Sequence, residues 1–197
     1  MKLRVYKFLE KTKVEGPYTR FCIWVQGCSR HCEGCYATET WDKNKGKLFE
    51  IDALFEKIKK QNNIEGITFL GGEPFEQAEA LSILAKKCKE INLGVITFTG
   101  STYEELKNKG DIHINSLLNN TDLLIDGGFE KDNLDYSRPW VGSSNQRYLF
   151  LTDRYTINDV ESAKNKIEIH FEKSGNIFLN GMGDFDKILR KLALYKH

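Results

Sequence analysis

The chain of 197 residues lacks any long hydrophobic run, because no segment approaches the ~18–20 apolar residues that span a bilayer. Its first residues, Met1 to Val5, lead into charged side chains and not into the apolar region of a signal peptide. An excess of charge of one sign is also missing: 29 Lys and Arg face 28 Asp and Glu. We therefore expect a cytoplasmic protein with no membrane partner and no nucleic-acid partner.

Cysteines are few and odd in number, which argues against a disulfide framework. Three of the five, Cys28, Cys32 and Cys35, fall within eight residues. In a reducing compartment such clustering is typical of metal binding. Cys22 lies within an apolar run and Cys88 on the apolar stripe of a predicted helix, so both are interpreted as core residues.

The periodicity of the apolar residues predicts alternating strands and helices. Strands are expected over residues 20–26, 64–70, 93–98, 121–125 and 147–151, and helices over 47–61, 76–91 and 103–108. Nearly continuous apolar strands are typical of a parallel sheet that is buried on both faces. The expected fold class is α/β, with an open or partial parallel (β/α) barrel over residues 1–150.

After about residue 150 the pattern changes. Residues 166–171 and 176–179 flank a turn at 172–175 and predict a β-hairpin, and residues 184–195 predict a terminal amphipathic helix. We therefore expect residues 151–197 to form a small C-terminal α+β appendage.

The spacing Cys28-x3-Cys32-x2-Cys35 suits one compact metal centre on the loop after the first predicted strand. Iron–sulfur clusters are held by cysteine thiolates, and three ligands leave one iron of a four-iron cluster open. An open position is typical of a reactive site. The alternative is structural zinc, with His31 or a distant side chain as the fourth ligand, although paired C-x2-C halves are absent.

Polar or glycine residues follow each of the next predicted strands. They are Gly71, Gly72 and Glu73, then Thr99 and Gly100, and finally Asp126. In parallel (β/α) barrels, chemistry gathers at the carboxyl ends of the strands, so these residues and the cysteines are expected at one mouth. The alternative for each is a plain turn, which for Glu73 would start a helix with Pro74 near its first position.

The cysteine motif resembles that of the radical S-adenosylmethionine superfamily. Further segments are similar to the activating proteins of anaerobic ribonucleotide reductase: Gly16-Pro17, Arg20, GCSRHCEGCY around the cysteines, Thr40-Trp41 and GSSNQR over 142–147. The resemblance covers about residues 1–150. It implies that Cys28, Cys32 and Cys35 bind a [4Fe-4S] cluster and that an open iron takes S-adenosyl-L-methionine.

The resemblance also implies roles for the supporting loops and a reaction. Glu73, with Gly71 and Gly72, would bind the amino group of S-adenosyl-L-methionine, and Thr99, Gly100 and Asp126 would contact the cofactor. An electron donor such as flavodoxin or ferredoxin would reduce the cluster, S-adenosylmethionine would be cleaved to a 5′-deoxyadenosyl radical, and that radical would oxidise a glycine of a partner such as anaerobic ribonucleotide reductase.

Two other functions stay open. The appendage lies outside the resemblance, and the first alternative is therefore a radical S-adenosylmethionine enzyme that modifies a peptide or a small molecule. A non-enzymatic electron-transfer or structural metal protein would need a fourth cysteine ligand, either Cys22 or Cys88.

Overall fold

The computed structural model describes residues 1–163, 167–171, 175, 177–183 and 185–194. A seven-stranded sheet forms the centre of the protein, in the order β3-β1-β2-β4-β5-β6-β7. Its strands are β1 (Lys2–Thr12), β2 (Arg20–Val25), β3 (Lys47–Glu50), β4 (Gly66–Gly71), β5 (Gly94–Phe98), β6 (Leu123–Asp126) and β7 (Arg147–Phe150). The four strands β2, β4, β5 and β6 are parallel, and β1, β3 and β7 pair antiparallel.

The expected α/β class and the mostly parallel sheet are confirmed. The expected partial (β/α) barrel is not confirmed: among the described strands, β3 and β7 end the sheet and do not pair with each other. No helix in the described part of the chain is long and apolar enough to cross a bilayer.

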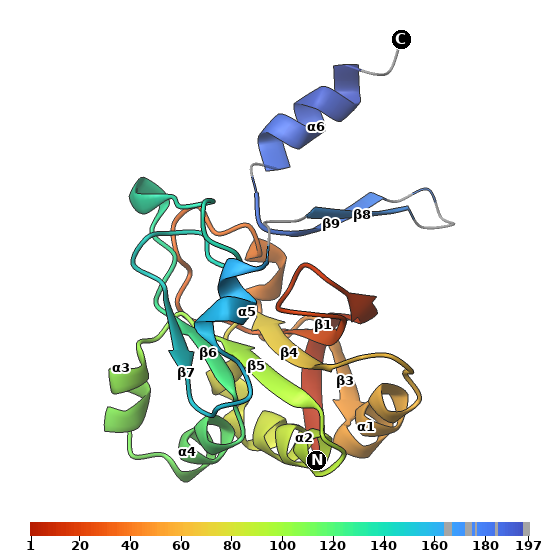
Figure 1. Cartoon of the computed structure of the whole chain (residues 1–197), viewed down its shortest axis with the longest axis vertical. Helices are drawn as coiled ribbons and strands as arrows, with labels where there is room; N and C mark the ends of the chain where they lie inside the picture. The colour runs from red at the N-terminus through yellow and green to blue at the C-terminus, as the bar shows by residue number, and fades with distance from the viewer. Residues whose placement is uncertain (164–166, 172–174, 176, 184, 195–197) are drawn as a thin grey trace.

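Helices connect the parallel strands and lie side by side along the sheet (Figure 1). The α-helices are α1 (Ile51–Lys59), α2 (Ala78–Glu90), α3 (Tyr103–Asn108), α4 (Ile112–Asn119), α5 (Ile157–Glu161) and α6 (Phe185–Leu194). Single-turn 3₁₀ helices are η1 (Thr38–Thr40), η2 (Pro74–Gln77) and η3 (Lys131–Asn133). Thr102 caps α3 in a capping box with Glu105.

Burial of both sheet faces explains the continuous apolar strands. In β2, Phe21 and Ile23 join the core cluster that includes Leu54 of α1 and Leu81 of α2. Cys22 and Trp24, which alternate with them along the strand, pack in a separate cluster on the opposite face. Cys22 and Cys88 are fully buried, as expected for core residues.

The expected helix over 47–61 was wrong at its start, because residues 47–50 form β3 against β1. The apolar residue that suggested helical spacing there, Leu48, is exposed. Strand β1 and helices α4 and α5 were not predicted.

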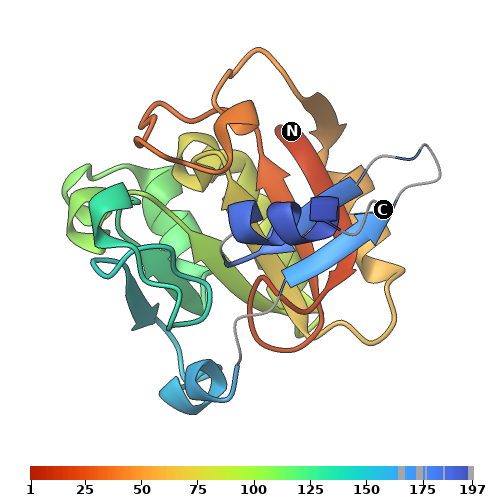
Figure 2. The ribbon, with the colours of Figure 1, turned by 90° about the horizontal axis from the view of Figure 1, so that it is seen from above.

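The C-terminal hairpin is confirmed as a separate two-stranded sheet, β8 (Ile167–Phe171) and β9 (Ile177–Gly181). The expected turn over 172–175 lies outside the described residues except for Gly175. Seen from above, the hairpin and α6 lie over the central sheet (Figure 2). Residues 151–161 instead pack on the sheet itself, where Tyr155 and Val160 join a core cluster with Ile96.

Candidate functional site

The cysteine loop, residues 27–41, leaves the end of β2 and is closed at its base by hydrogen bonds. The Gly27 amide donates to the Thr40 carbonyl (2.6 Å) and the Cys28 amide donates to the Trp41 carbonyl (3.1 Å). Backbone pairing of the two loop ends therefore holds the three cysteines in one compact turn.

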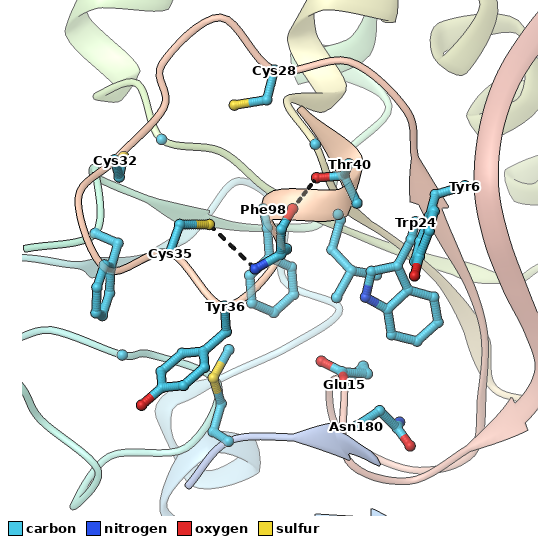
Figure 3. A pocket seen from close by; sticks show the side chains of 18 of the residues that line it. Tyr6, Glu15, Trp24, Cys28, Cys32, Cys35, Tyr36, Thr40, Phe98 and Asn180 are labelled. Atoms are coloured by element: carbon cyan, nitrogen blue, oxygen red, sulfur yellow. Dashed lines mark hydrogen bonds between the residues drawn. The ribbon is translucent and has the colours of Figure 1, made fainter. Parts of the chain in front are cut away.

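Cys28, Cys32 and Cys35 are half-buried free thiols that line one cavity. Figure 3 shows the three cysteines around the bend of the loop, beside the cavity. The sulfur of Cys35 accepts from the Ala37 amide at 3.4 Å. Burial raises the pKa of the Cys28 thiol, and backbone amides at its sulfur oppose this rise. The donor set is thus three soft sulfur ligands on a single loop.

The loop is shaped by residues between the cysteines. His31 and Gly34 adopt left-handed backbone conformations, with φ of 48° and 76°. The His31 ring stacks on Trp41 with centroids 4.5 Å apart, and Glu76 accepts from the Ser29 amide (2.7 Å) and hydroxyl (2.5 Å). His31 therefore packs against Trp41 at the base of the loop.

The chemistry of the three sulfur ligands suits an iron–sulfur cluster. Within the described residues, no three His, Cys, Asp or Glu side chains converge closely enough to hold one ion. Iron–sulfur clusters bind each thiolate at a separate iron, so their ligands stand apart around a larger centre. The three thiols beside a cavity therefore supply the ligand type that such a cluster needs.

The second predicted segment, Gly71 to Glu73, lies against the start of the cysteine loop. The Gly72 amide donates to the Val25 carbonyl (2.9 Å), and the Glu73 amide donates to the Gly27 carbonyl (2.8 Å). A Cβ at Gly72 would lie 2.2 Å from the Gly27 oxygen, so only glycine permits this approach. Gly71 has a φ of 102°, a conformation that also favours glycine.

The buried carboxylate of Glu73 joins the ends of β4 and β5. Its Oε1 accepts from the Phe75 amide (3.0 Å) and the Thr99 hydroxyl (2.9 Å), and its Oε2 accepts from the Gly100 amide (2.9 Å). Burial raises the pKa of Glu73 despite these donors. The structure thus brings Glu73, Thr99 and Gly100 together beside the cavity.

Asp126 is not among the residues that line the cavity. Its side chain is fully buried, so it is not a solvated turn residue either. The carboxylate accepts from Arg147 Nε (2.9 Å) and Nη2 (2.5 Å) and from the Tyr103 amide (2.7 Å). It therefore ties β6 to β7 and to the start of α3, and its contact with a cofactor stays a prediction.

The GSSNQR segment holds the loop that follows β6. Asn145 Nδ2 donates to the Gly128 carbonyl (2.7 Å) and Gln146 Nε2 donates to the Gly127 carbonyl (3.1 Å). Gln146 Oε1 also accepts from the Gly142 amide (2.7 Å). The motif is therefore explained as a brace for one wall of the cavity.

The cavity has a volume of about 430 Å³. Sequence reasoning missed part of its lining, which comes from β1, from the loop after β1 and from the C-terminal segment: Tyr6, Lys7, Glu15, Phe178, Leu179, Asn180, Gly181, Met182, Gly183 and Phe185. Glu15 is buried, and its Oε2 has no hydrogen-bond partner within the described part of the chain. No local motif marks these residues, because the fold assembles them from both ends of the chain.

Comparison with known proteins adds to this geometry. A family model described as "4Fe-4S single cluster domain" matches residues 14–149. Two relatives are anaerobic ribonucleoside-triphosphate reductase-activating proteins. The one from Enterobacteria phage T4 is 34% identical over 146 residues, which cover 71% of this chain and 89% of that protein. The one from Salmonella typhi is 32% identical over 154 residues, which cover 73% and 96%.

Among solved structures, the crystal structure of QueE from Escherichia coli aligns with a TM-score of 0.44 and 19% identity, over 52% of this chain and 54% of that chain. This likeness is too low to bear on function. The sequence relatives, in contrast, are matched over most of their own length. The chain belongs to the family of anaerobic ribonucleoside-triphosphate reductase-activating proteins.

Proposed function

We propose that Cys28, Cys32 and Cys35 bind a [4Fe-4S] cluster, that S-adenosylmethionine binds in the adjoining cavity, and that the chain activates an anaerobic ribonucleoside-triphosphate reductase. The observation that carries the proposal is the position of the three thiols on one loop beside Glu73, Thr99 and Gly100. The open sheet would correspond to the partial barrel of radical S-adenosylmethionine enzymes. A flavodoxin or ferredoxin in the cytoplasm would supply the electron.

The bound cluster would supply one electron to the sulfonium of S-adenosylmethionine and so provide the radical that takes a hydrogen atom from a glycine of the reductase. The residues of this chain hold and shield the reactants. Gly71 and Gly72 permit close backbone approach at the cavity wall. Trp24, Leu70 and Phe98 give the cavity apolar surface, which would limit the access of water to the reactants.

Glu73 retains capacity for a ligand ammonium group. A carboxylate oxygen has two acceptor lone pairs. Oε1 accepts from both Phe75 and Thr99, whereas Oε2 accepts from Gly100 alone. One acceptor position on Oε2 therefore remains for the amino group of S-adenosylmethionine, with charge assistance from both partners.

The test begins with anaerobic reconstitution with iron and sulfide, followed by iron analysis and visible absorbance. We expect Cys28→Ala, Cys32→Ala and Cys35→Ala to lose the cluster. The matched controls, Cys22→Ala and Cys88→Ala, should retain it because both side chains are buried away from the cavity. Loss of the cluster in either control would contradict the three-cysteine site. It would favour an electron-transfer protein in which that cysteine is the fourth ligand of the cluster.

The reconstituted protein is then mixed with S-adenosylmethionine, dithionite and the reductase. We expect 5′-deoxyadenosine by chromatography and a glycyl radical by electron paramagnetic resonance. Absence of 5′-deoxyadenosine would refute the cofactor chemistry. If 5′-deoxyadenosine forms without a glycyl radical on the reductase, the peptide or small-molecule alternative is supported instead.

A further inference from the structure

The β8–β9 hairpin has an unusual distribution of side chains. Its inner face, toward the body of the protein, carries Glu168, His170, Phe178 and Asn180. Its outer face is apolar, and Phe171 and Ile177, which pair across the hairpin, are 74% and 57% exposed. An antiparallel sheet ordinarily buries its apolar face and exposes its polar one. This hairpin is therefore held down mainly by polar contacts.

Those contacts form a latch between the hairpin and the end of β1. Glu168 accepts from the Thr12 hydroxyl (2.6 Å) and from the Lys13 amide (3.0 Å). Asn180 Nδ2 donates to the Thr12 hydroxyl (3.2 Å), and the Gly181 amide donates to Glu15 Oε1 (2.9 Å).

One aromatic ring of the hairpin enters the cavity. The Phe178 ring lies edge-on to Trp24, with centroids 6.4 Å apart, and Lys7 Nζ lies 3.1 Å from its centre. Beyond β9, Phe185 packs edge-on against Tyr36 of the cysteine loop at 5.5 Å. The C-terminal segment thus bridges from β1 to the cysteine loop across the cavity.

The part of this segment that lines the cavity contains two glycines, Gly181 and Gly183, on either side of Met182. Gly181 has a φ of 107°, which favours glycine. Figure 3 shows Glu15 and Asn180 on the side of the cavity opposite Cys28. The segment also lies beyond residue 149, where the family match ends.

We propose that residues 177–183 are an autoinhibitory strap, which occupies the approach that a glycine-bearing loop of the reductase needs in order to reach the cavity. This inference rests on the proposed function. The strap presents glycine backbone to the cavity that the cysteines also line, and the reductase would present the same kind of backbone there. Binding of the reductase and closure of the strap therefore exclude each other, and the closed fraction raises the apparent Kd for the reductase.

Two variants release the strap, and one controls for them. Glu168→Ala removes the latch to Thr12 and Lys13, and Phe178→Ala removes the ring from the cavity. Phe171→Ala removes a ring of the same kind from the outer face of the same hairpin.

The first readout needs no partner and no cofactor. In the cluster-free protein, a bulky maleimide should alkylate Cys28, Cys32 and Cys35 about fivefold faster or more in both release variants, as typical coupling energies allow. Mass spectrometry of the modified peptides gives the rates. Phe171→Ala should match the wild type. Equal alkylation rates in the release variants and the wild type would overturn the proposal.

The second readout is glycyl radical formation at varied reductase concentration. We expect the KM for the reductase to fall about fivefold or more in both release variants. The kcat should stay unchanged in Glu168→Ala, because that side chain does not line the cavity. An unchanged or higher KM would show that the segment covers the cavity without competing, and would overturn the proposal. Failure of the proposed function gives a different result, because neither the variants nor the wild type would then form the glycyl radical.

Discussion

Glu15 should make the folded protein less stable as the pH rises toward neutrality. Burial raises the pKa of Glu15 to about 7, although the Gly181 amide and the Lys7 ammonium act in the opposite direction. The ordinary value, which applies to the unfolded chain, is 4.5. Between these values the folded protein keeps a proton that the unfolded chain has lost, so the free energy of unfolding falls with rising pH.

The size of the effect follows from the difference between the two pKa values. One pKa unit corresponds to 1.36 kcal/mol, so a difference of about 2.5 gives about 3 kcal/mol lost between pH 4.5 and pH 7. Below pH 4.5 both states hold the proton and the stabilisation is complete; above about pH 7 both have lost it. Glu15→Gln, which is neutral at every pH, removes this dependence.

The assay is urea denaturation of the wild type and of Glu15→Gln at intervals from pH 4.5 to pH 8. The difference between their free energies of unfolding should change by about 3 kcal/mol, in favour of the variant at high pH. Glu10→Gln is the matched control, since Glu10 is an exposed glutamate at the end of β1. Parallel pH profiles for the wild type and Glu15→Gln would refute the reasoning.

Two further predictions concern the frame of the site. Tyr155→Phe removes a hydroxyl that accepts from buried Arg20 (2.7 Å) and donates to Glu65 (2.6 Å). Urea denaturation should therefore show a free energy of unfolding that is lower by about 1–3 kcal/mol. An unchanged free energy of unfolding would mean that these two hydrogen bonds do not stabilise the fold. Gly72→Ala places a Cβ 2.2 Å from the Gly27 oxygen, so the loop after β4 and the cysteine loop must move apart. Iron analysis after reconstitution should therefore show less bound cluster. Full iron content would show that this close approach is not needed for cluster binding.

The parallel strands were predictable because each is a short apolar run that is buried on both faces. β1 was missed for the opposite reason. It is an antiparallel strand near the sheet edge, with charged residues such as Lys7 and Glu10 interspersed among apolar ones. At β3, Leu48 fits a helical spacing with Ile51 but is exposed on the sheet edge. Apolar spacing alone does not show which face of an edge strand is covered.

In the candidate site, too, the residues in local motifs were predictable and those brought together by the tertiary fold were not. Glu73 was identified because the residues that define its role are contiguous, and the ends of parallel strands bring Thr99 and Gly100 to it. Glu15 and Gly181 are 166 positions apart, and no periodicity links them. Their pairing depends on which face of the hairpin docks on the body of the protein. Sequence pattern alone would have predicted that the apolar face docks, whereas Phe171 and Ile177 on that face are exposed.

The inverted hairpin has an energetic consequence for the site. Hydrogen bonds contribute only about 0.5–1.5 kcal/mol each, because water replaces them when they break. Among the described residues, the hairpin is held to the body by a few such bonds and one inserted ring, whereas the sheet beneath it is held by a continuous apolar core. The hairpin can therefore open without loss of the sheet or of the hydrogen bonds that close the base of the cysteine loop. A cover over a preformed site requires this difference, in which the cover opens at a lower free energy than the sheet that carries the site unfolds.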